Sequence, residues 1–264
     1  ADEQGNIFDE PGLKMLCRQG NDLALPRPDE LIPLPPESEL YLLPGRRAMG
    51  FDPQTGRVEV IDGIAVAAFV CPGYTLCGLS AYLTENEAPR LPLFAYGAVG
   101  YFQGKFWVAA KQIDKDRRQV FAHIPQKKIN IGAQNLLKKY PGNRLVKHLA
   151  RCALNYCCPA AKNLALGRFE APLPSSRACN ARCLGCISLQ PEDSGFPSTQ
   201  SRITFTPTSH EIVQIMFEHS RKEKRPVYSF GQGCEGEPLT EAKLIASAIS
   251  DFRLKGGKGT ININ

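Results

Sequence analysis

The sequence contains no apolar stretch long enough to cross a membrane and no secretory leader. Its longest strongly apolar run, Ile64 to Cys71, is far shorter than the roughly 20 residues that a bilayer-spanning helix needs. The first residues, Ala1 to Asp9, are polar and acidic and do not resemble a signal peptide. We therefore expect no membrane association. Because the initiator Met is also missing, we expect a processed chain or a fragment of a longer one.

Histidine is scarce, and no second cysteine pair has the spacing of a zinc finger. The four histidines show no ligand spacing with one another, so we expect surface or packing roles for His123, His148, His210 and His219. Ten cysteines could form five disulfides in a secreted protein. Their clustering is more typical of metal ligands or reduced thiols, which favours a cytoplasmic chain.

Charge is unevenly distributed along the 264 residues, although the net charge is only +6. Residues 1–40 contain nine acids and three bases, whereas residues 111–151 contain eleven Lys or Arg and two Asp. A local basic excess of this size could attract an anionic partner such as RNA. A solvated basic face is the alternative explanation. The length and the hydrophobic content of 43% fit one or two soluble domains.

The first half of the chain predicts an extended arm followed by a β-rich domain. Residues 1–36 are rich in proline and have little periodicity, apart from a possible short helix near Leu13–Cys17. Residues 37–130 alternate short apolar runs with expected turns at Pro44-Gly45, Asp52–Gly56 and Gln103-Gly104, and could form a small barrel. Its aromatic residues could stack bases or pack in the core: Tyr96, Tyr101, Phe102, Phe106 and Trp107.

Residues 131–164 predict a helical connector. Asn143 can cap a helix whose apolar stripe includes Cys152, so we expect Cys152 to be a core residue. Cys157 and Cys158 end this helix just before a proline. An auxiliary iron–sulfur cluster formed by these two thiols with Cys71 and Cys77 is an alternative that no fixed spacing supports.

Residues 165–264 predict an α/β fold with parallel strands. Expected strands at 166–171, 226–230 and 259–264 alternate with two helices, one opened by a capping box at Thr208–Glu211 and the other by Pro238. Strand–helix–strand connections of this kind give parallel strands through right-handed crossovers. Binding sites in such sheets form at the carboxyl ends of the strands.

Three cysteines follow the first of these strands, and a glycine-rich acidic segment follows the second. Cys179, Cys183 and Cys186 form a C-x3-C-x2-C pattern, and three thiolates in one loop suit a soft metal centre. The second loop reads Gly-Gln-Gly-Cys-Glu-Gly-Glu-Pro over residues 231–238. Its glycines allow close backbone approach to a ligand, and its carboxylates can accept bonds from an ammonium group. Hereafter Cys179–Cys186 is the cysteine loop and Gly231–Pro238 is the glycine-rich segment.

Together these motifs resemble the radical S-adenosylmethionine (radical SAM) superfamily over residues 165–264. The resemblance implies a [4Fe-4S] cluster held by Cys179, Cys183 and Cys186, with SAM on the fourth iron. The amino group of SAM would contact three residues of the glycine-rich segment: Glu235, Gly236 and Glu237. The family reductively cleaves SAM to a 5′-deoxyadenosyl radical, which abstracts hydrogen from a substrate. A reductase or a flavodoxin- or ferredoxin-type donor would supply the electron.

The sequence also differs from the family pattern at several points. The residue before the third cysteine is usually aromatic but here is Gly185, whose backbone could still meet the adenine. Cys234 has no role in the signature and could be a packed residue or a thiol that faces the site. Family barrels usually have six strands, so we expect this region to be the first half of a partial (βα) barrel, truncated at residue 264.

Two classes of function remain open at the level of sequence. The first is a radical SAM enzyme that acts on RNA or a peptide, with unidentified catalytic residues. The second is a non-catalytic iron–sulfur or zinc protein that could bind RNA.

Overall fold

The computed structural model describes residues 1–264 and divides the chain into two compact units, 1–122 and 123–264. Its fold is mixed α/β, with several sheets, five α-helices and no closed barrel. The chain therefore divides once, between Ala122 and His123. Residues 1–36 and 131–164 do not form parts of their own, which corrects the expected arm and connector. None of the helices combines the length and apolarity that a membrane span requires.

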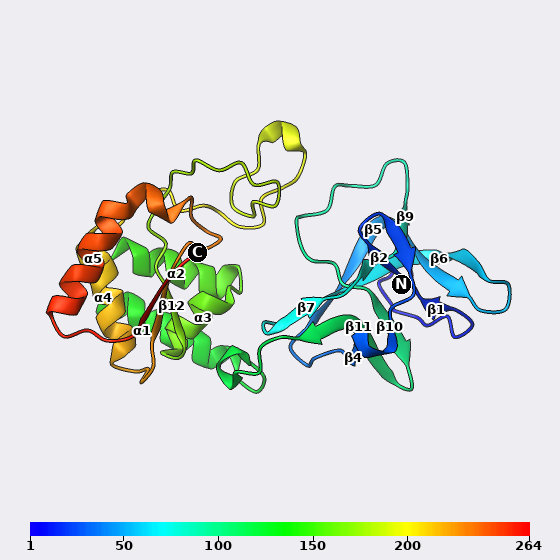
Figure 1. Ribbon diagram of the computed structural model, residues 1–264, viewed down its shortest axis with the longest axis horizontal. Coiled ribbons are helices and arrows are strands. Elements are labelled where there is room, and N and C mark those ends of the chain that lie inside the picture. Colours follow the sequence, from blue (N-terminus) through cyan, green and yellow to red (C-terminus); the bar gives the residue numbers. More distant parts are fainter. The chain divides into compact units, whose positions relative to one another are not determined.

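The first unit consists of short strands around one long hairpin (Figure 1). β5 (Glu39–Asp52) pairs antiparallel with β6 (Arg57–Phe69). The expected tight turn joins them, because the Gly56 N–H donates to the Asp52 carbonyl at 2.9 Å and Gly56 has a φ of +69°. β5 also continues past Gly45, where a turn was expected. A register shift after Leu43 absorbs that glycine as a bulge.

Residues 1–36 contribute four strands to the sheets of this unit. β1 (Lys14–Met15) pairs with β5, and β4 (Leu31–Pro33) pairs with β11 (Lys105–Gln112). Between them, β2 (Cys17–Gln19) pairs with β3 (Asp22–Ala24) and with β8 (Leu79–Ser80). The short helix expected near Leu13–Cys17 is therefore wrong. Pairing with distant strands overrides the weak helical pattern of so short a stretch.

The remaining strands of this unit complete its sheets. β9 (Tyr82–Thr84) joins β5, β7 (Tyr74–Leu76) joins β11, and β10 (Val99–Phe102) forms a hairpin with β11. The turn at Gln103-Gly104 of this hairpin was predicted. Among the aromatics, Tyr96 lies in a ring cluster with Tyr41 and Phe94, whereas Phe102 is 62% exposed. Core packing therefore accounts for Tyr96.

The second unit contains the helices and a parallel sheet in the order β12-β13-β14. These strands are β12 (Glu170–Pro172), β13 (Val227–Phe230) and β14 (Thr260–Ile263), so the predicted parallel arrangement is confirmed. β12 begins later than expected because α3 (Pro159–Leu166) continues up to Gly167. Gly167 ends the helix in the left-handed conformation, with a φ of +66°.

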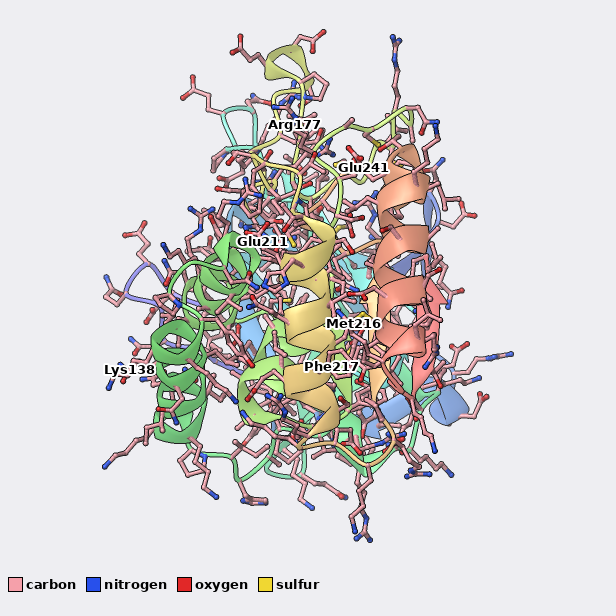
Figure 2. The ribbon with its side chains drawn as sticks, turned by 90° about the vertical axis from the view of Figure 1, so that its left-hand side faces the viewer. Lys138, Arg177, Glu211, Met216, Phe217 and Glu241 are labelled. Atoms are coloured by element: carbon pink, nitrogen blue, oxygen red, sulfur yellow. The ribbon has the colours of Figure 1, made fainter.

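Helices α4 (Ser209–Ser220) and α5 (Ala242–Leu254) connect these strands and pack against each other. Figure 2 shows the two helices side by side, with Met216 and Phe217 labelled on α4. The predicted capping box opens α4, and the short 3-10 helix η4 (Pro238–Glu241) precedes α5. The Met216 side chain is fully buried in the core that both helices share with the sheet. The ring of Phe217 packs against that of Phe252 on α5, with 4.8 Å between the ring centroids and an angle of 58° between the ring planes.

Helices α1 (Gln126–Lys139) and α2 (Arg144–Asn155) belong to the same unit. Asn143 caps α2 as predicted, because its side chain accepts a hydrogen bond from Val146 N–H at 2.9 Å. Leu136 of α1 and Leu145 of α2 are buried in the core that also contains residues of the sheet. This shared core explains why residues 131–164 are not a separate connector.

Candidate functional site

The three cysteines of the cysteine loop lie between β12 and α4, in a long segment whose only helix is the 3-10 helix η3 (Glu192–Ser194). Cys179 and Cys183 are exposed, Cys186 is half-buried, and all three are free thiols. A turn joins the last two, with the Cys186 N–H donating to the Cys183 carbonyl at 3.2 Å. Thiols are the ligand type that a soft metal centre prefers, but the sulfurs of these three cysteines do not converge into a group of ligand atoms in this structure.

Of the three cysteines, Cys186 is the one whose sulfur has side-chain hydrogen-bond partners. Arg202 Nη2 donates to its Sγ at 3.3 Å, and the Ser188 hydroxyl lies 3.9 Å from the same sulfur. Burial alone would raise the pKa of Cys186. Hydrogen bonds from the backbone and side chain of Ser188, the Leu189 backbone and the Arg202 charge outweigh it, so the pKa is lowered. The thiolate that a metal requires is thus favoured at this position.

The glycine-rich segment lies directly beside the residues that lead into the cysteine loop. Gly236 N–H donates to the Ser176 carbonyl at 2.7 Å, and Glu237 N–H donates to the Ala178 carbonyl at 2.9 Å. A Cβ atom at Gly236 would lie 1.8 Å from the Ala178 oxygen, so only glycine permits this approach. The two loops predicted to meet at the carboxyl ends of β12 and β13 are therefore adjacent.

Glu235 has a structural role that was not expected. Its carboxylate is buried, with 4% of the residue exposed. One oxygen accepts from the Gly231 and Gln232 N–H groups at 2.7 and 2.8 Å. The other oxygen accepts from the two N–H groups of Ser175 and Ser176 and from the Ser175 hydroxyl, at 2.7 to 3.1 Å. Because five donors of the chain bind its two oxygens, the Glu235 carboxylate holds the two loops together.

Glu237 retains an available oxygen at the same junction. It is half-buried and caps η4, with its Oε1 accepting from Leu239 N–H at 3.1 Å. Its Oε2 has no hydrogen-bond partner within the chain. Gly185 is exposed, with no atom within 4 Å of the position that a Cβ would take. Of the residues expected to contact SAM, Glu237 is the one that combines an unpartnered carboxylate oxygen with proximity to the cysteine loop.

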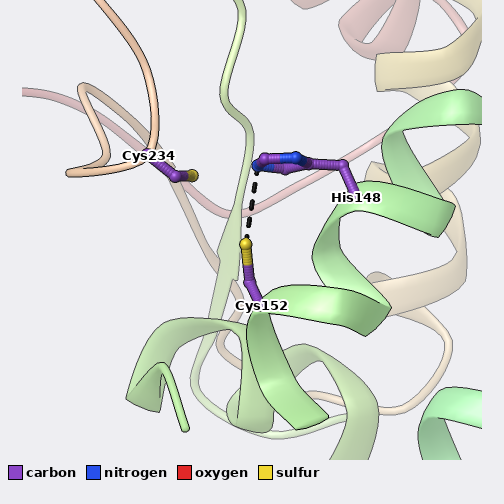
Figure 3. A group of neighbouring side chains, drawn as sticks. All are labelled: His148, Cys152 and Cys234. Atoms are coloured by element: carbon purple, nitrogen blue, oxygen red, sulfur yellow. Dashed lines mark hydrogen bonds between the residues drawn. The ribbon is translucent and has the colours of Figure 1, made fainter. Parts of the chain in front are cut away.

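The second unit also contains a buried group of possible metal ligands that the sequence did not predict. His148 and Cys152 lie four residues apart on α2, and Cys234 lies in the glycine-rich segment. Their ligand atoms all lie within 4.8 Å of one another, so the group could hold a metal ion (Figure 3). The spacing of His148 and Cys152 on one helical face was the available signal, but the sequence does not show that Cys234 lies beside them.

The ionisation of the two thiols in this group is coupled. Interaction with the neighbouring Cys234 thiol and the contact with His148 lower the pKa of Cys152 to about 5 despite burial. Interaction with Cys152 and burial raise the pKa of Cys234.

The cysteines considered for an auxiliary cluster do not form a group in either unit. Cys71 and Cys77 belong to the first unit and Cys157 and Cys158 to the second, and within neither unit do these thiols form a metal-binding group.

The basic segment 111–151 is also divided between the two units. Four of its bases are paired with acids: Lys111, Arg118, Lys139 and Arg144.

Comparison with protein-family models, with curated proteins and with solved structures finds no match to this chain.

Proposed function

We propose that the protein is a radical SAM enzyme whose cysteine loop binds a [4Fe-4S] cluster through Cys179, Cys183 and Cys186. The observation that carries the proposal is the pair of backbone hydrogen bonds that joins the glycine-rich segment to Ser176 and Ala178, immediately before Cys179. This contact brings a carboxylate next to a three-thiol loop. A ligand on an open iron could then present its amino group to Glu237.

The surrounding fold supports the same proposal. Three parallel strands in consecutive order, joined by α4 and α5, match the order expected for the first three strands of a radical SAM partial barrel. Both loops follow the carboxyl ends of neighbouring strands, where α/β sheets form their sites. A reduced cluster would supply the electron that cleaves SAM, while the chain positions the reactants. The electron would come from a reductase or a flavodoxin- or ferredoxin-type protein, and the substrate class is RNA or a peptide.

Each residue has a defined part in this proposal. Glu237 would accept from the ammonium group of SAM, and Arg202 would donate to the sulfur of Cys186 and so adjust the reduction potential. Glu235 and Gly236 would hold the two loops in place rather than touch SAM through a side chain. Gly185 would leave open space beside the third cysteine, where family members usually have an aromatic ring.

Iron analysis tests this proposal. Protein purified and reconstituted without oxygen should contain about four irons per chain. Replacing Cys179, Cys183 and Cys186 together by Ala should abolish this iron, whereas Cys157→Ser, a change at an exposed cysteine elsewhere, should retain it. Stoichiometric zinc in the cysteine loop with no iron after reconstitution would reject the proposal.

A second candidate function is a non-catalytic metal-binding protein, which the buried group of His148, Cys152 and Cys234 favours. The two candidates differ in their response to SAM. An enzyme of the proposed class should change its cluster spectrum when SAM is added, whereas a structural metal protein should not.

A further inference from the structure

Three soft ligand atoms converge in the interior of the second unit, on residues outside the cysteine loop. α2 presents His148 and Cys152 on successive turns, and the loop after β13 presents Cys234 opposite them (Figure 3). The Nε2 atom of His148 lies 3.5 Å from Cys152 Sγ, and all three ligand atoms lie within 4.8 Å of one another. These side chains come from segments about 80 residues apart in sequence, which the fold brings together.

The separation of His148 Nε2 and Cys152 Sγ equals that of neighbouring ligands in a tetrahedral metal site, and Cys234 Sγ lies within 4.8 Å of both atoms. Zinc binds thiolate sulfur at about 2.3 Å and imidazole nitrogen at about 2.0–2.1 Å, which places neighbouring ligand atoms roughly 3.5–3.8 Å apart. The His148–Cys152 distance already has this value. A covalent bond between the two sulfurs would instead require a separation of about 2.05 Å.

The surroundings explain why a metal would be favourable here. His148, Cys152 and Cys234 are 8%, 1% and 5% exposed, and Cys152 and Cys234 are part of a cluster of alanines and Ile129. Polar groups enclosed by apolar side chains cost free energy unless they are satisfied. A divalent ion with two thiolates and a neutral imidazole carries no net charge, so it suits this environment.

We propose that His148, Cys152 and Cys234 bind one zinc-type divalent ion, with a small ligand such as water in the fourth position. Binding requires both sulfurs as thiolates, so any thiol proton on Cys152 or Cys234 would be released to solvent, with no change of oxidation state. Because Cys234 directly precedes Glu235, the ion would fasten the glycine-rich segment to α2. The inference is independent of the proposed function, since none of its ligands belongs to the cysteine loop.

Cobalt binding tests the site without interference from the cysteine loop. In the variant with Cys179, Cys183 and Cys186 all replaced by Ala, added Co²⁺ should bind once per chain. It should show the visible d–d bands of tetrahedral cobalt and a sulfur-to-cobalt charge-transfer band. Adding Cys152→Ser, Cys234→Ser or His148→Gln to this background should each weaken binding by about 100-fold or more, because losing a direct ligand exceeds the 10–100-fold cost of losing a supporting partner.

The matched control is Cys157→Ser in the same background, which changes an exposed cysteine outside the group and should leave the cobalt spectrum unaltered. Circular dichroism should show that each variant is folded, and native mass spectrometry of the parent variant should show the added mass of one Zn²⁺. Absence of bound Co²⁺ and Zn²⁺ in the folded parent variant would overturn the proposal. So would a cobalt spectrum that survives Cys152→Ser and Cys234→Ser together, or a Cys152–Cys234 disulfide in protein kept reduced during purification.

Discussion

The backbone N–H of Glu237 donates a 2.9 Å hydrogen bond to the carbonyl of Ala178, the residue before the first cysteine of the cysteine loop. This bond joins two loops that follow neighbouring parallel strands. It brings the Glu237 carboxylate to the edge of the loop that we propose to hold the cluster. The predictions below examine this junction, its supporting residues and the helices beneath it.

Gly236 should be intolerant of any side chain. A Cβ atom there would lie 1.8 Å from the Ala178 oxygen, so Gly236→Ala must separate the two loops. We expect a loss of about 1–3 kcal/mol in the free energy of unfolding, as for other overpacked sites, and reduced iron binding. Gly185→Ala is the control for unfolding, because its Cβ would meet no atom within 4 Å. Chemical denaturation of the two variants measures the difference, and equal stabilities would contradict the described contact.

Substitution of Glu235 should reduce the stability of the fold more than substitution of Glu237, because we assign Glu235 a structural role and Glu237 a role in ligand binding. Glu235→Gln leaves buried backbone donors facing an amide that cannot satisfy all of them, so it should destabilise the fold by about 2–4 kcal/mol. Glu237→Gln keeps an oxygen for the Leu239 N–H and should cost less than about 1 kcal/mol. Denaturation curves of the two variants provide the test. A destabilisation by Glu237→Gln as large as that by Glu235→Gln would remove the distinction.

Arg202 should promote ionisation of Cys186 in protein that lacks a cluster. Its guanidinium donates to the Cys186 sulfur, and its charge is one of the causes that lower the pKa of Cys186. Arg202→Met should therefore raise this pKa and slow alkylation of Cys186 near neutral pH, because the thiolate is the reactive form. Mass spectrometry can follow Cys186 and Cys183 in the same sample. The rate at Cys183 should not change, and an unchanged rate at Cys186 would exclude this role for Arg202.

The ion pair between α2 and α4 should make stability depend on acidic pH. Burial alone would raise the pKa of Glu211, but hydrogen bonds from Arg144 and Thr208 and the Arg144 charge lower it from 4.5 to about 2. Because the folded state keeps this carboxylate ionised at lower pH than the unfolded chain does, the contribution is complete above pH 4.5 and is lost as the pH falls to about 2.

Replacing Arg144 measures this contribution. Its side chain is 48% exposed, so solvent screening reduces the effect, and Arg144→Met should lower the free energy of unfolding only modestly at pH 7. The difference from wild type should shrink between pH 4.5 and 2. Urea denaturation across this range tests the prediction. A difference that stays constant with pH would show that Arg144 acts through packing alone.

Local signals in the sequence predicted the second unit well. The Asn143 cap, the Thr208–Glu211 capping box and three short apolar runs determined the helices and parallel strands, because each feature acts within a few residues. In the first unit, the turns at Gly56 and Gly104 were also evident. The strands within residues 1–36 could not be predicted, because they exist through pairing with distant partners.

The candidate site was predictable to a similar extent. The sequence placed the cysteine loop and the glycine-rich segment at neighbouring strand ends, and the structure brings them together. It could not predict the structural role of the Glu235 carboxylate, since that role depends on N–H groups about 60 residues away in the chain. The group of His148, Cys152 and Cys234 was missed for the same reason, because its third ligand comes from a different part of the fold.

SAM titration of the reduced cluster, followed by electron paramagnetic resonance, tests the central claim most directly. The wild-type spectrum should change on addition of SAM. Glu237→Gln should weaken SAM binding by about ten- to a hundredfold, since a carboxylate that accepts from an ammonium is worth roughly 1.5–3 kcal/mol. The iron content of Glu237→Gln should equal that of wild type. A wild-type cluster whose spectrum does not respond to SAM would contradict the assignment as a radical SAM enzyme, and an unaltered titration in Glu237→Gln would exclude Glu237 from the SAM site.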